Sequence, residues 1–274
     1  MISLVDSVIQ LVLKPIGEVI KVRFSVDDKR FTAFVPDDNI WIAIKDVLLN
    51  REYEFLPEFE LYNFTGGVIV DAGAHVGLFS LVASAFAGRV IAIEPSQVNY
   101  HLLMLNLLTN NIGNVVPVNK ALYHHKGKLR LFEGSHTGAH SLIGSSNRFE
   151  EVEAITLEEI VDYYGSIDLL KIDIEGEEFE LFNHIDLETL NCIKMIVGEM
   201  HLQHGDISSI VNKLKFAGFK LQLAHPPLWK RGFSYGIELY GMVKLRILRG
   251  ILYTLSGITG YKDKNLAILF AQKR

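Results

Sequence analysis

The hydrophobic positions of the chain follow two alternating patterns. Short apolar runs rich in β-branched residues predict strands, and the first five are nearly all apolar, as expected of strands buried on both faces of a sheet. The seven runs are "GVIVDAG", "RVIAIEP", "NVVPVNKAL", "DLLKIDIEG", "CIKMIVGEMH", "FKLQLA" and "LAILFAQ". Helical spacing predicts helices between them, over residues 75–87, 97–111, 156–164, 177–184 and 206–217. This alternation predicts an α/β fold with a doubly wound, mostly parallel, seven-stranded sheet.

The predicted sheet occupies residues 62–274 as one domain, and residues 1–61 form an N-terminal extension. In the extension, "EVIKVRFSVDDKRFTAFVP" predicts a hairpin that turns near Asp27 and Asp28, and "NIWIAIKDVLLN" predicts a helix. We expect the extension to pack on the edge of the sheet. An insertion, residues 225–264, separates the last two strands. Residues 242–255 within it read as a helix with three cations, suited to a membrane surface, a lid, a dimer interface or, more simply, a cover for the core.

Composition narrows the class of protein. Apolar residues make up 49% and charged residues 22% of the 274, which is typical of a globular chain. The net charge of −5 argues against a nucleic-acid partner, whose binding surfaces are basic. The single cysteine, Cys192, allows no intrachain disulfide and favours a cytoplasmic setting, with peripheral membrane contact left open. Composition leaves the oligomeric state undetermined.

The stretch "VDAGAHVGLFSLV", residues 70–82, resembles a nucleotide-binding loop. A dinucleotide fingerprint requires G-x-G-x-x-G, but Ala74 and His75 follow Gly73. A P-loop is excluded because leucine, not lysine, follows Gly77. The remaining pattern, D-x-G-x-x-x-G beginning at Asp71, suits a ligand that carries an amino acid and a nucleoside but no phosphate.

The second predicted strand ends in an acid, Glu94, within "VIAIEPS". A carboxylate at this point can accept hydrogen bonds from both hydroxyls of a ribose and would repel a 2′-phosphate. Its position directly after four apolar residues favours ligand binding over a merely solvated strand end. Glycine loop and acid together indicate an adenosine-containing ligand.

Polar residues also end the fourth and fifth strands. In "KIDIEG", Asp173 and Glu175 alternate with isoleucines and share one side of the chain; in "GEMH", Glu199 and His201 alternate around a methionine. The carboxyl ends of these strands are where open α/β sheets bind ligands. The carboxylates suit a base, an orienter of substrate or a counter-charge, although Glu175 could equally cap the following helix.

His201 is the first candidate for a general base, because an ordinary histidine titrates near pH 6.5. Two alternatives stay open at this point. The ring could be a strand-end histidine bonded to backbone, or Asp173, Glu199 and His201 could hold a divalent cation, which is not favoured. His204 and the histidines at 124, 125, 136 and 140 are expected to be solvated loop residues.

Together these motifs resemble the FkbM-type S-adenosylmethionine-dependent methyltransferases. The resemblance rests on "VDAGAHVGLFSL", "AIEPS" with "NLLTNN", "ALYHHKGKLRLFEG" leading to "HSL", and "DLLKIDIEGEEFELF", and covers residues 51–201. It implies a class I methyltransferase fold, Rossmann-like, that binds S-adenosylmethionine and methylates a hydroxyl of a sugar, glycolipid or small metabolite. It also implies an acid and a histidine at the end of strand five, here Glu199 and His201.

Carried onto this chain, the resemblance assigns the cofactor to one set of residues. Asp71, Gly73 and Gly77 would line its methionine end, Glu94 its ribose, and Ala121 its adenine. The full set also includes Ala74, His75, Pro95 and Asp173. The family's usual asparagine in the glycine loop is His75 here, a departure that leaves the role of this side chain open. The competing hypothesis is a non-catalytic adenosyl-binding or membrane-associated module; a dehydrogenase is disfavoured by the broken glycine triplet.

Overall fold

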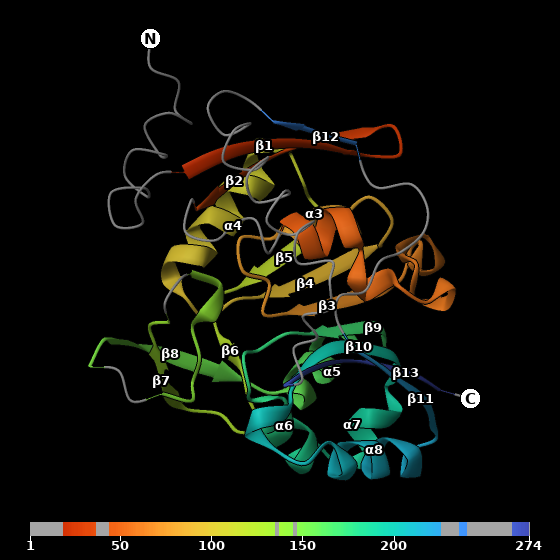
Figure 1. Cartoon of the computed structure of the whole chain (residues 1–274). Coiled ribbons are helices and arrows are strands. Elements are labelled where there is room, and N and C mark those ends of the chain that lie inside the picture. Colours follow the sequence, from red (N-terminus) through yellow and green to blue (C-terminus); the bar gives the residue numbers. More distant parts are fainter. Residues whose placement is uncertain are drawn as a thin grey trace.

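The computed structural model describes residues 19–36, 44–134, 137–144, 147–225, 236–239 and 265–273. A seven-stranded sheet runs through its centre in the order β11-β13-β10-β9-β3-β4-β5 (Figure 1). In chain order its strands are β3 Val68–Ala72, β4 Arg89–Ile93, β5 Val115–Val118, β9 Ile167–Ile172, β10 Ile193–His201, β11 Phe219–Ala224 and β13 Leu266–Lys273. All seven predicted strands lie in this sheet.

The sheet is doubly wound. Strands β5, β4, β3, β9 and β10 run parallel, and β13 is antiparallel to both of its neighbours. The strand order reverses between β3 and β9, which is the point where open α/β sheets bind ligands at the carboxyl ends of their strands. The α/β prediction is therefore confirmed, and the candidate residues lie in the last residues of β3 and β10 or just after β3, β4 and β9, at this edge.

Helices cover both faces of the sheet. On one face lie α3 Leu78–Ala83 and α4 Gln97–Thr109, and on the other lie α5 Leu157–Tyr164, α6 Glu178–His184, α7 Leu187–Asn191 and α8 Ile207–Phe216. The five predicted helices are present with shorter bounds, and α7 was not predicted. Helix α5 begins with a capping box, in which the side chains of Thr156 and Glu159 each accept from the other's backbone N–H.

The N-terminal hairpin is present as predicted but packs differently. Strands β1 Val19–Val26 and β2 Lys29–Pro36 pair on either side of the predicted turn, where Asp27 has a positive φ of 50°. The hairpin lies on α4, not on the edge of the sheet: the Phe34 backbone N–H donates to Asn106 Oδ1 at 2.7 Å, and Asn106 Nδ2 returns a bond to the Phe34 carbonyl. A buried amide that pairs with backbone on both sides fixes the hairpin on the helix.

The insertion contributes a strand to the hairpin. Strand β12 Gly236–Leu239 pairs antiparallel with β1, which gives a second sheet of order β12-β1-β2. The predicted helix at 242–255 lies outside the described residues. Residues 44–50 of the helix predicted from "NIWIAIKDVLLN" form a π-helix, Ile44–Asn50. The boundary near residue 61 remains a prediction.

Short elements complete the described chain. Single 3₁₀ turns are Glu52–Glu54, Pro57–Phe59, Leu61–Phe64, Thr137–Ala139 and Leu202–His204. A third sheet, of order β6-β8-β7, consists of β6 Ala121–Leu122, β7 Lys128–Phe132 and β8 Phe149–Ile155. Within the ranges the structure describes, no helix combines the length and hydropathy that a membrane span requires.

Gly73 provides a test of the fold, because its φ of +75° coincides with a close approach of two loops. A Cβ added to it would overlap the carbonyl oxygen of Asp173. We expect Gly73→Ala to lower the free energy of unfolding by at least about 3 kcal/mol in urea titrations, from left-handed strain plus this overlap. Gly66 is the matched control, since its φ is +76° but a Cβ there has open space; Gly66→Ala should cost only about 1–2 kcal/mol. Equal costs would contradict the close approach.

Candidate active site

A buried ion pair joins the glycine loop to strand β9. Lys171 Nζ lies 3.1 Å from Asp71 Oδ1 and donates to the Gly73 carbonyl at 2.9 Å, while Ser80 Oγ donates to Asp71 Oδ2 at 2.6 Å. Asp71 is fully buried and Lys171 is 3% exposed. Burial lowers the pKa of Lys171, but Asp71 and Asp173 outweigh burial and raise it, so the ammonium stays charged. Asp71 therefore directs its carboxylate to the protein, and its predicted contact with the cofactor stays a prediction.

The two glycines of the loop serve the packing of the loop. Gly73 lets the loop approach the backbone of Asp173, whose N–H also donates to the carbonyl of Ala72 on β3. Gly77, at a φ of +85°, precedes α3 as its N-cap, and a Cβ there would overlap the side chain of Leu103 on α4. The sequence argument for Gly77, close packing of a helix, is confirmed.

Glu94 lies beneath the glycine loop and accepts three hydrogen bonds. Its carboxylate receives the backbone N–H of His75 at 2.8 Å, the backbone N–H of Ser96 at 3.0 Å and Nδ2 of Asn99 at 3.3 Å. Burial raises its pKa to about 7 against the opposing effect of these donors. His75 thus contributes its backbone, in a left-handed conformation with φ 53°, to hold this acid.

The remaining predicted cofactor residues lie around Glu94. Ala74 is buried, and its backbone N–H donates to the carbonyl of the last residue of β4. Pro95 is half-buried, and Asn119 Nδ2 donates to its carbonyl at 3.0 Å. Ala121 begins β6 and is 3% exposed. The structure brings the ends of β3, β4 and β5 together, as the predicted cofactor set requires.

The catalytic candidates converge beside this loop. Asp173, Glu199 and His201 each place one oxygen or nitrogen atom within 4.8 Å of those of the other two. Asp173 follows β9, whereas the other two residues end β10. Met200 between the last two is fully buried, so Glu199 and His201 share one side as predicted. A divalent cation there would have to displace the side-chain partners that these residues have in this structure.

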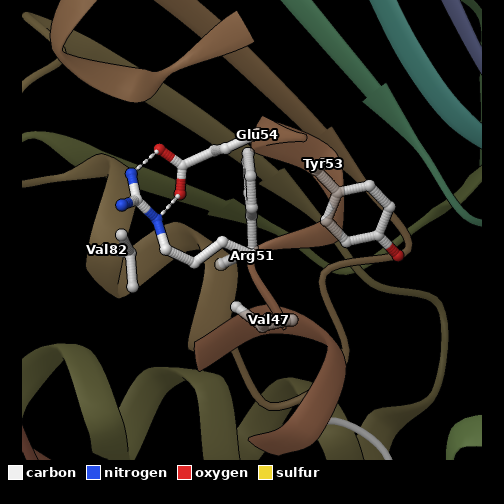
Figure 2. Close-up of a pocket in the computed structure, with 6 residues that line it drawn as sticks. Val47, Arg51, Tyr53, Glu54 and Val82 are labelled. Atoms are coloured by element: carbon white, nitrogen blue, oxygen red, sulfur yellow. Dashed lines mark hydrogen bonds and ion pairs between the residues drawn. The ribbon is translucent and has the colours of Figure 1, made fainter. Parts of the chain in front are cut away.

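Tyr53, in the extension, is one of those partners, and no motif in the sequence marks it. Its hydroxyl lies 3.0 Å from Asp173 Oδ2 and 3.0 Å from Glu199 Oε1, and has a single proton to donate to them. Its ring is 4% exposed, with Lys171 Nζ 5.3 Å from its centroid. In Figure 2 this hydroxyl points away from the neighbouring bidentate pair of Arg51 and Glu54.

Arg51 and Glu54 line a small pocket next to Tyr53. The pocket has about 180 Å³ of space between atoms, part of it open solvent, and leaves no room inside for a water-sized molecule. It is lined by Val47, Arg51, Tyr53, Glu54, Phe79 and Val82 (Figure 2). It is too small for a nucleoside, so it is a packing defect behind Tyr53, not the ligand site.

The group holds more acids than cations. Burial raises the pKa of Glu199 to about 8, with Asp173 and Asp46 adding to the shift, and burial raises the pKa of Glu52 well above its ordinary value. Glu52 and Glu199 share a side-chain hydrogen bond, which requires a proton on one of them. Burial, then the charge of Asp173, raises the pKa of Glu175 to about 8. Burial and mutual repulsion therefore favour the protonated forms of these carboxyls.

His201 is charged in this arrangement. Its Nδ1 lies 3.1 Å from Glu178 Oε1 and its Nε2 lies 3.5 Å from Glu175 Oε2. Burial lowers the pKa of the ring, but the bond to Glu178 and the charges of Glu178, Asp173 and Glu175 raise it to about 10. The expectation of a pKa near 6.5 was wrong, because sequence alone does not show how many carboxylates surround the ring. The alternative interpretation, a strand-end histidine bonded to backbone, also differs from the structure, where the ring nitrogens of His201 face the carboxylates of Glu178 and Glu175.

The capping alternative for Glu175 has no support in the described loop. Helix α6 begins at Glu178 with Glu177 as its N-cap and no side-chain cap. The loop amides of Ile174 and Gly176 are bound at 3.2 Å by Glu178 Oε1. Glu175 instead faces His201, with a positive φ of 55°.

Comparison with known proteins agrees with this geometry. The family model described as "Methyltransferase FkbM domain" matches residues 71–221, more than half of the chain. The chain therefore belongs to the FkbM methyltransferase family; it is a methyltransferase, and its sheet is that of the class I methyltransferases, as predicted.

Two curated proteins and one solved structure are similar. "Methyltransferase 1" of Beauveria bassiana (strain ARSEF 2860) is 21% identical over 208 residues, 66% of this chain and 82% of its own. "Methyltransferase sdnD" of Sordaria araneosa is 27% identical over 190 residues, 56% of this chain and 73% of its own. The structure of methyltransferase FkbM from Methylobacillus flagellatus KT has 18% identity and a TM-score of 0.44, covering 64% of this chain and 44% of that one.

Removing the Tyr53 hydroxyl tests the shared contact. Tyr53→Phe leaves Asp173 and Glu199 without this donor, and we expect a loss of about 1–3 kcal/mol in the free energy of unfolding. Glu199, with its pKa raised to about 8, contributes stability that is complete below its ordinary pKa near 4.5 and is lost as pH rises through about 8. In the variant, repulsion between ionised Glu199 and Asp173 is unrelieved, so the loss should grow from about pH 6 to about pH 9.

Urea titrations at both pH values measure this difference. Tyr62→Phe is the control, because Tyr62 is 55% exposed, and it should change stability by less than about 0.5 kcal/mol at either pH. A loss in Tyr53→Phe that matches the control, or that shrinks with pH, would refute the bridging role.

Proposed function

We propose that this methyltransferase transfers a methyl group from S-adenosylmethionine to a hydroxyl of a sugar, glycolipid or small metabolite. The observation that carries the proposal is the convergence of Asp173, Glu199 and His201 beside the glycine loop. Methyl transfer to a hydroxyl requires a proton acceptor next to the methyl donor, and these strand ends bring acids, a histidine and the loop together. Family membership favours turnover over a purely binding module.

The residues present suit S-adenosylmethionine, which supplies an electrophilic methyl group and a sulfonium charge when bound. Glu94 would accept the ribose hydroxyls: it is a buried carboxylate whose pKa of about 7 reflects too few donors for its charge, and hydroxyl donors would stabilise that charge. The acids Asp173, Glu199 and Glu175 also suit a cation, whose charge would oppose the burial and repulsion that raise the pKa of Glu199 and Glu175.

His201 would be the residue that accepts the proton of the acceptor hydroxyl. As an imidazolium with a pKa of about 10 it has no lone pair available, so it must first lose a proton. A positive charge among its neighbouring carboxylates opposes the charge on the ring and lowers that pKa. Glu178 would hold Nδ1, which leaves Nε2 to work beside Glu175.

Tyr53, Asp173 and Glu199 would orient the acceptor. A hydroxyl that approaches Glu199 or Asp173 meets carboxylate oxygens already aligned by Tyr53, which restricts the acceptor to one direction. Neither a nucleic-acid partner nor a metal is part of the proposal. Peripheral membrane contact through 242–255, which would suit a glycolipid, falls outside the described residues, and a cytoplasmic location is part of this proposal.

Calorimetric titration tests the cofactor. Wild-type protein should bind S-adenosylmethionine and S-adenosylhomocysteine, and Glu94→Ala should weaken both by at least about tenfold, or roughly 1.4 kcal/mol. Glu94→Gln, which keeps one acceptor oxygen, should weaken them less. Glu188→Ala, at an exposed position on α7, serves as the control.

Either of two results would contradict this assignment. Folded wild-type protein that binds neither ligand would remove the cofactor and the enzyme hypothesis together. Tight binding that is unaffected by Glu94→Ala would keep the cofactor and remove the ribose contact.

Transfer of labelled methyl groups tests the reaction. With a panel of sugars, glycolipids and small alcohols, we expect an ether product, and His201→Ala should lower kcat by at least about 100-fold with little change in cofactor affinity. The rate should rise with pH, because the acceptor needs His201 deprotonated and its pKa lies above its usual value. His101→Ala, exposed on α4, is the control. Unchanged kcat in His201→Ala, or a rate that falls with pH, would reject His201 as the base.

A further inference from the structure

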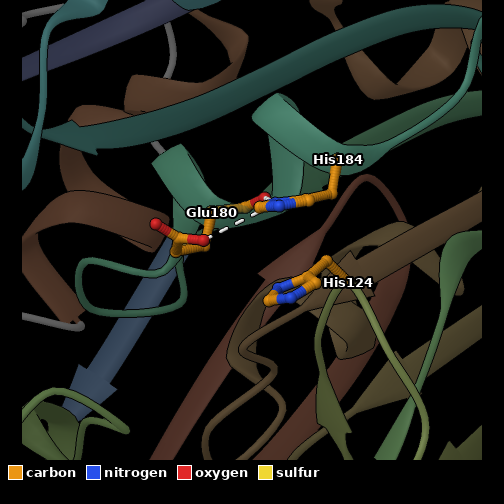
Figure 3. A group of neighbouring side chains, drawn as sticks. All are labelled: His124, Glu180 and His184. Carbon is orange, nitrogen blue, oxygen red and sulfur yellow. Dashed lines mark hydrogen bonds and ion pairs between the residues drawn. The ribbon is translucent and has the colours of Figure 1, made fainter.

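A second cluster of metal-binding side chains lies outside the active site. His124 follows β6, and Glu180 and His184 lie one turn apart on α6 (Figure 3). One ligand atom from each of the three lies within 4.8 Å of the other two. The rings of His124 and His184 are stacked, with centroids 4.2 Å apart and an interplanar angle of 19°. His124 lies in a loop, as expected, but the residue is half-buried and its ring stacks on that of His184 instead of standing alone in solvent.

The two rings have nitrogens available for a ligand. Nδ1 of His184 lies 2.9 Å from the carbonyl oxygen of Glu180, so an Nδ1–H that donates there leaves the lone pair on Nε2. Metal-binding histidines are usually fixed in this manner by a carbonyl or carboxylate. Nδ1 of His124 is buried and has no hydrogen-bond partner in the described part of the chain. A buried polar atom without a partner calls for an unseen ligand.

Both sides of the cluster are held by regular structure. The N–H of Tyr123, next to His124, donates to the carbonyl of Ile155 at the end of β8, and the other two residues belong to one helix. Around a tetrahedral ion with bonds of about 2.1 Å, ligand atoms lie about 3.4 Å apart. Because the three ligand atoms lie within 4.8 Å of one another, they need to approach by at most about 1.4 Å. The side chain of Glu180 is 52% exposed, so its carboxylate can make this movement by side-chain rotation while His184 keeps its bond to the carbonyl.

We propose that His124, Glu180 and His184 form a binding site for a divalent transition-metal ion of the zinc class. Two imidazoles and one carboxylate suit zinc, nickel or copper, whereas magnesium and calcium prefer oxygen ligands alone. Water would complete the coordination. The ion would tie the segment after β6 to α6, whose first residue, Glu178, holds His201. The site is separate from the proposed methyl transfer, so either can fail without the other.

Zinc titration of the full chain tests the site. After treatment with a chelator, wild-type protein should bind one equivalent of Zn²⁺ in calorimetry, show a higher Tm with zinc, and show neither effect with Mg²⁺. His124→Ala, His184→Ala and Glu180→Gln should each weaken zinc binding by at least about tenfold, because each removes one of three ligands. Circular dichroism of each variant checks its fold.

Two control variants show whether a loss of zinc binding is specific to the three proposed ligands. His101→Ala removes an exposed histidine on α4, and His201→Ala removes the histidine of the other group that could hold an ion. Both should bind zinc as wild type does. The proposal is overturned if the three ligand variants bind zinc undiminished, if His201→Ala alone abolishes binding, or if wild-type binding is confined to millimolar zinc.

Discussion

The site is organised around one buried ammonium, that of Lys171. It forms an ion pair with Asp71 on β3, donates to the carbonyl of Gly73 in the glycine loop, and lies 3.9 Å from Asp173 after β9. It also faces the ring of Tyr53. One charge thus connects two strands, the glycine loop and the N-terminal extension.

A buried ion pair of this kind adds little net stability, because desolvation consumes most of the Coulomb energy. Its effect is positional. Removing either charge leaves the other uncompensated in a dry site, which costs about 3–5 kcal/mol, so the carboxylate of Asp71 stays on Lys171. Asp71 is fully buried, and in this structure its carboxylate serves the architecture of the loop.

Burial and backbone conformation explain which parts of the fold and site can be predicted from the sequence. The strands could be predicted because burial on both faces of the sheet requires a continuous run of apolar residues. The glycines could be predicted because a positive φ, or a close approach of two chain segments, tolerates few other residues. Glu199 and His201 were paired by strand periodicity alone. The pKa of His201 was not predictable, because it depends on carboxylates from β9 and α6 that only the tertiary structure brings near. Tyr53 was missed for the same reason: it precedes the sheet in sequence and reaches Asp173 across 120 residues.

The contribution of Tyr53 changes the role of the extension. A segment that merely covered the sheet would present apolar side chains, but residues 52–54 bring two acids and a phenol into a buried position. The hairpin ahead of them is bonded to α4 through Asn106 and pairs with β12 from the insertion. Extension and insertion, distant in sequence, therefore share one sheet on the helical layer above the glycine loop (Figure 1). Tyr53 bridges the carboxylates of Asp173 after β9 and Glu199 in β10, and the hairpin of the same extension pairs with the insertion, so the extension contacts both the edge of the sheet and the insertion.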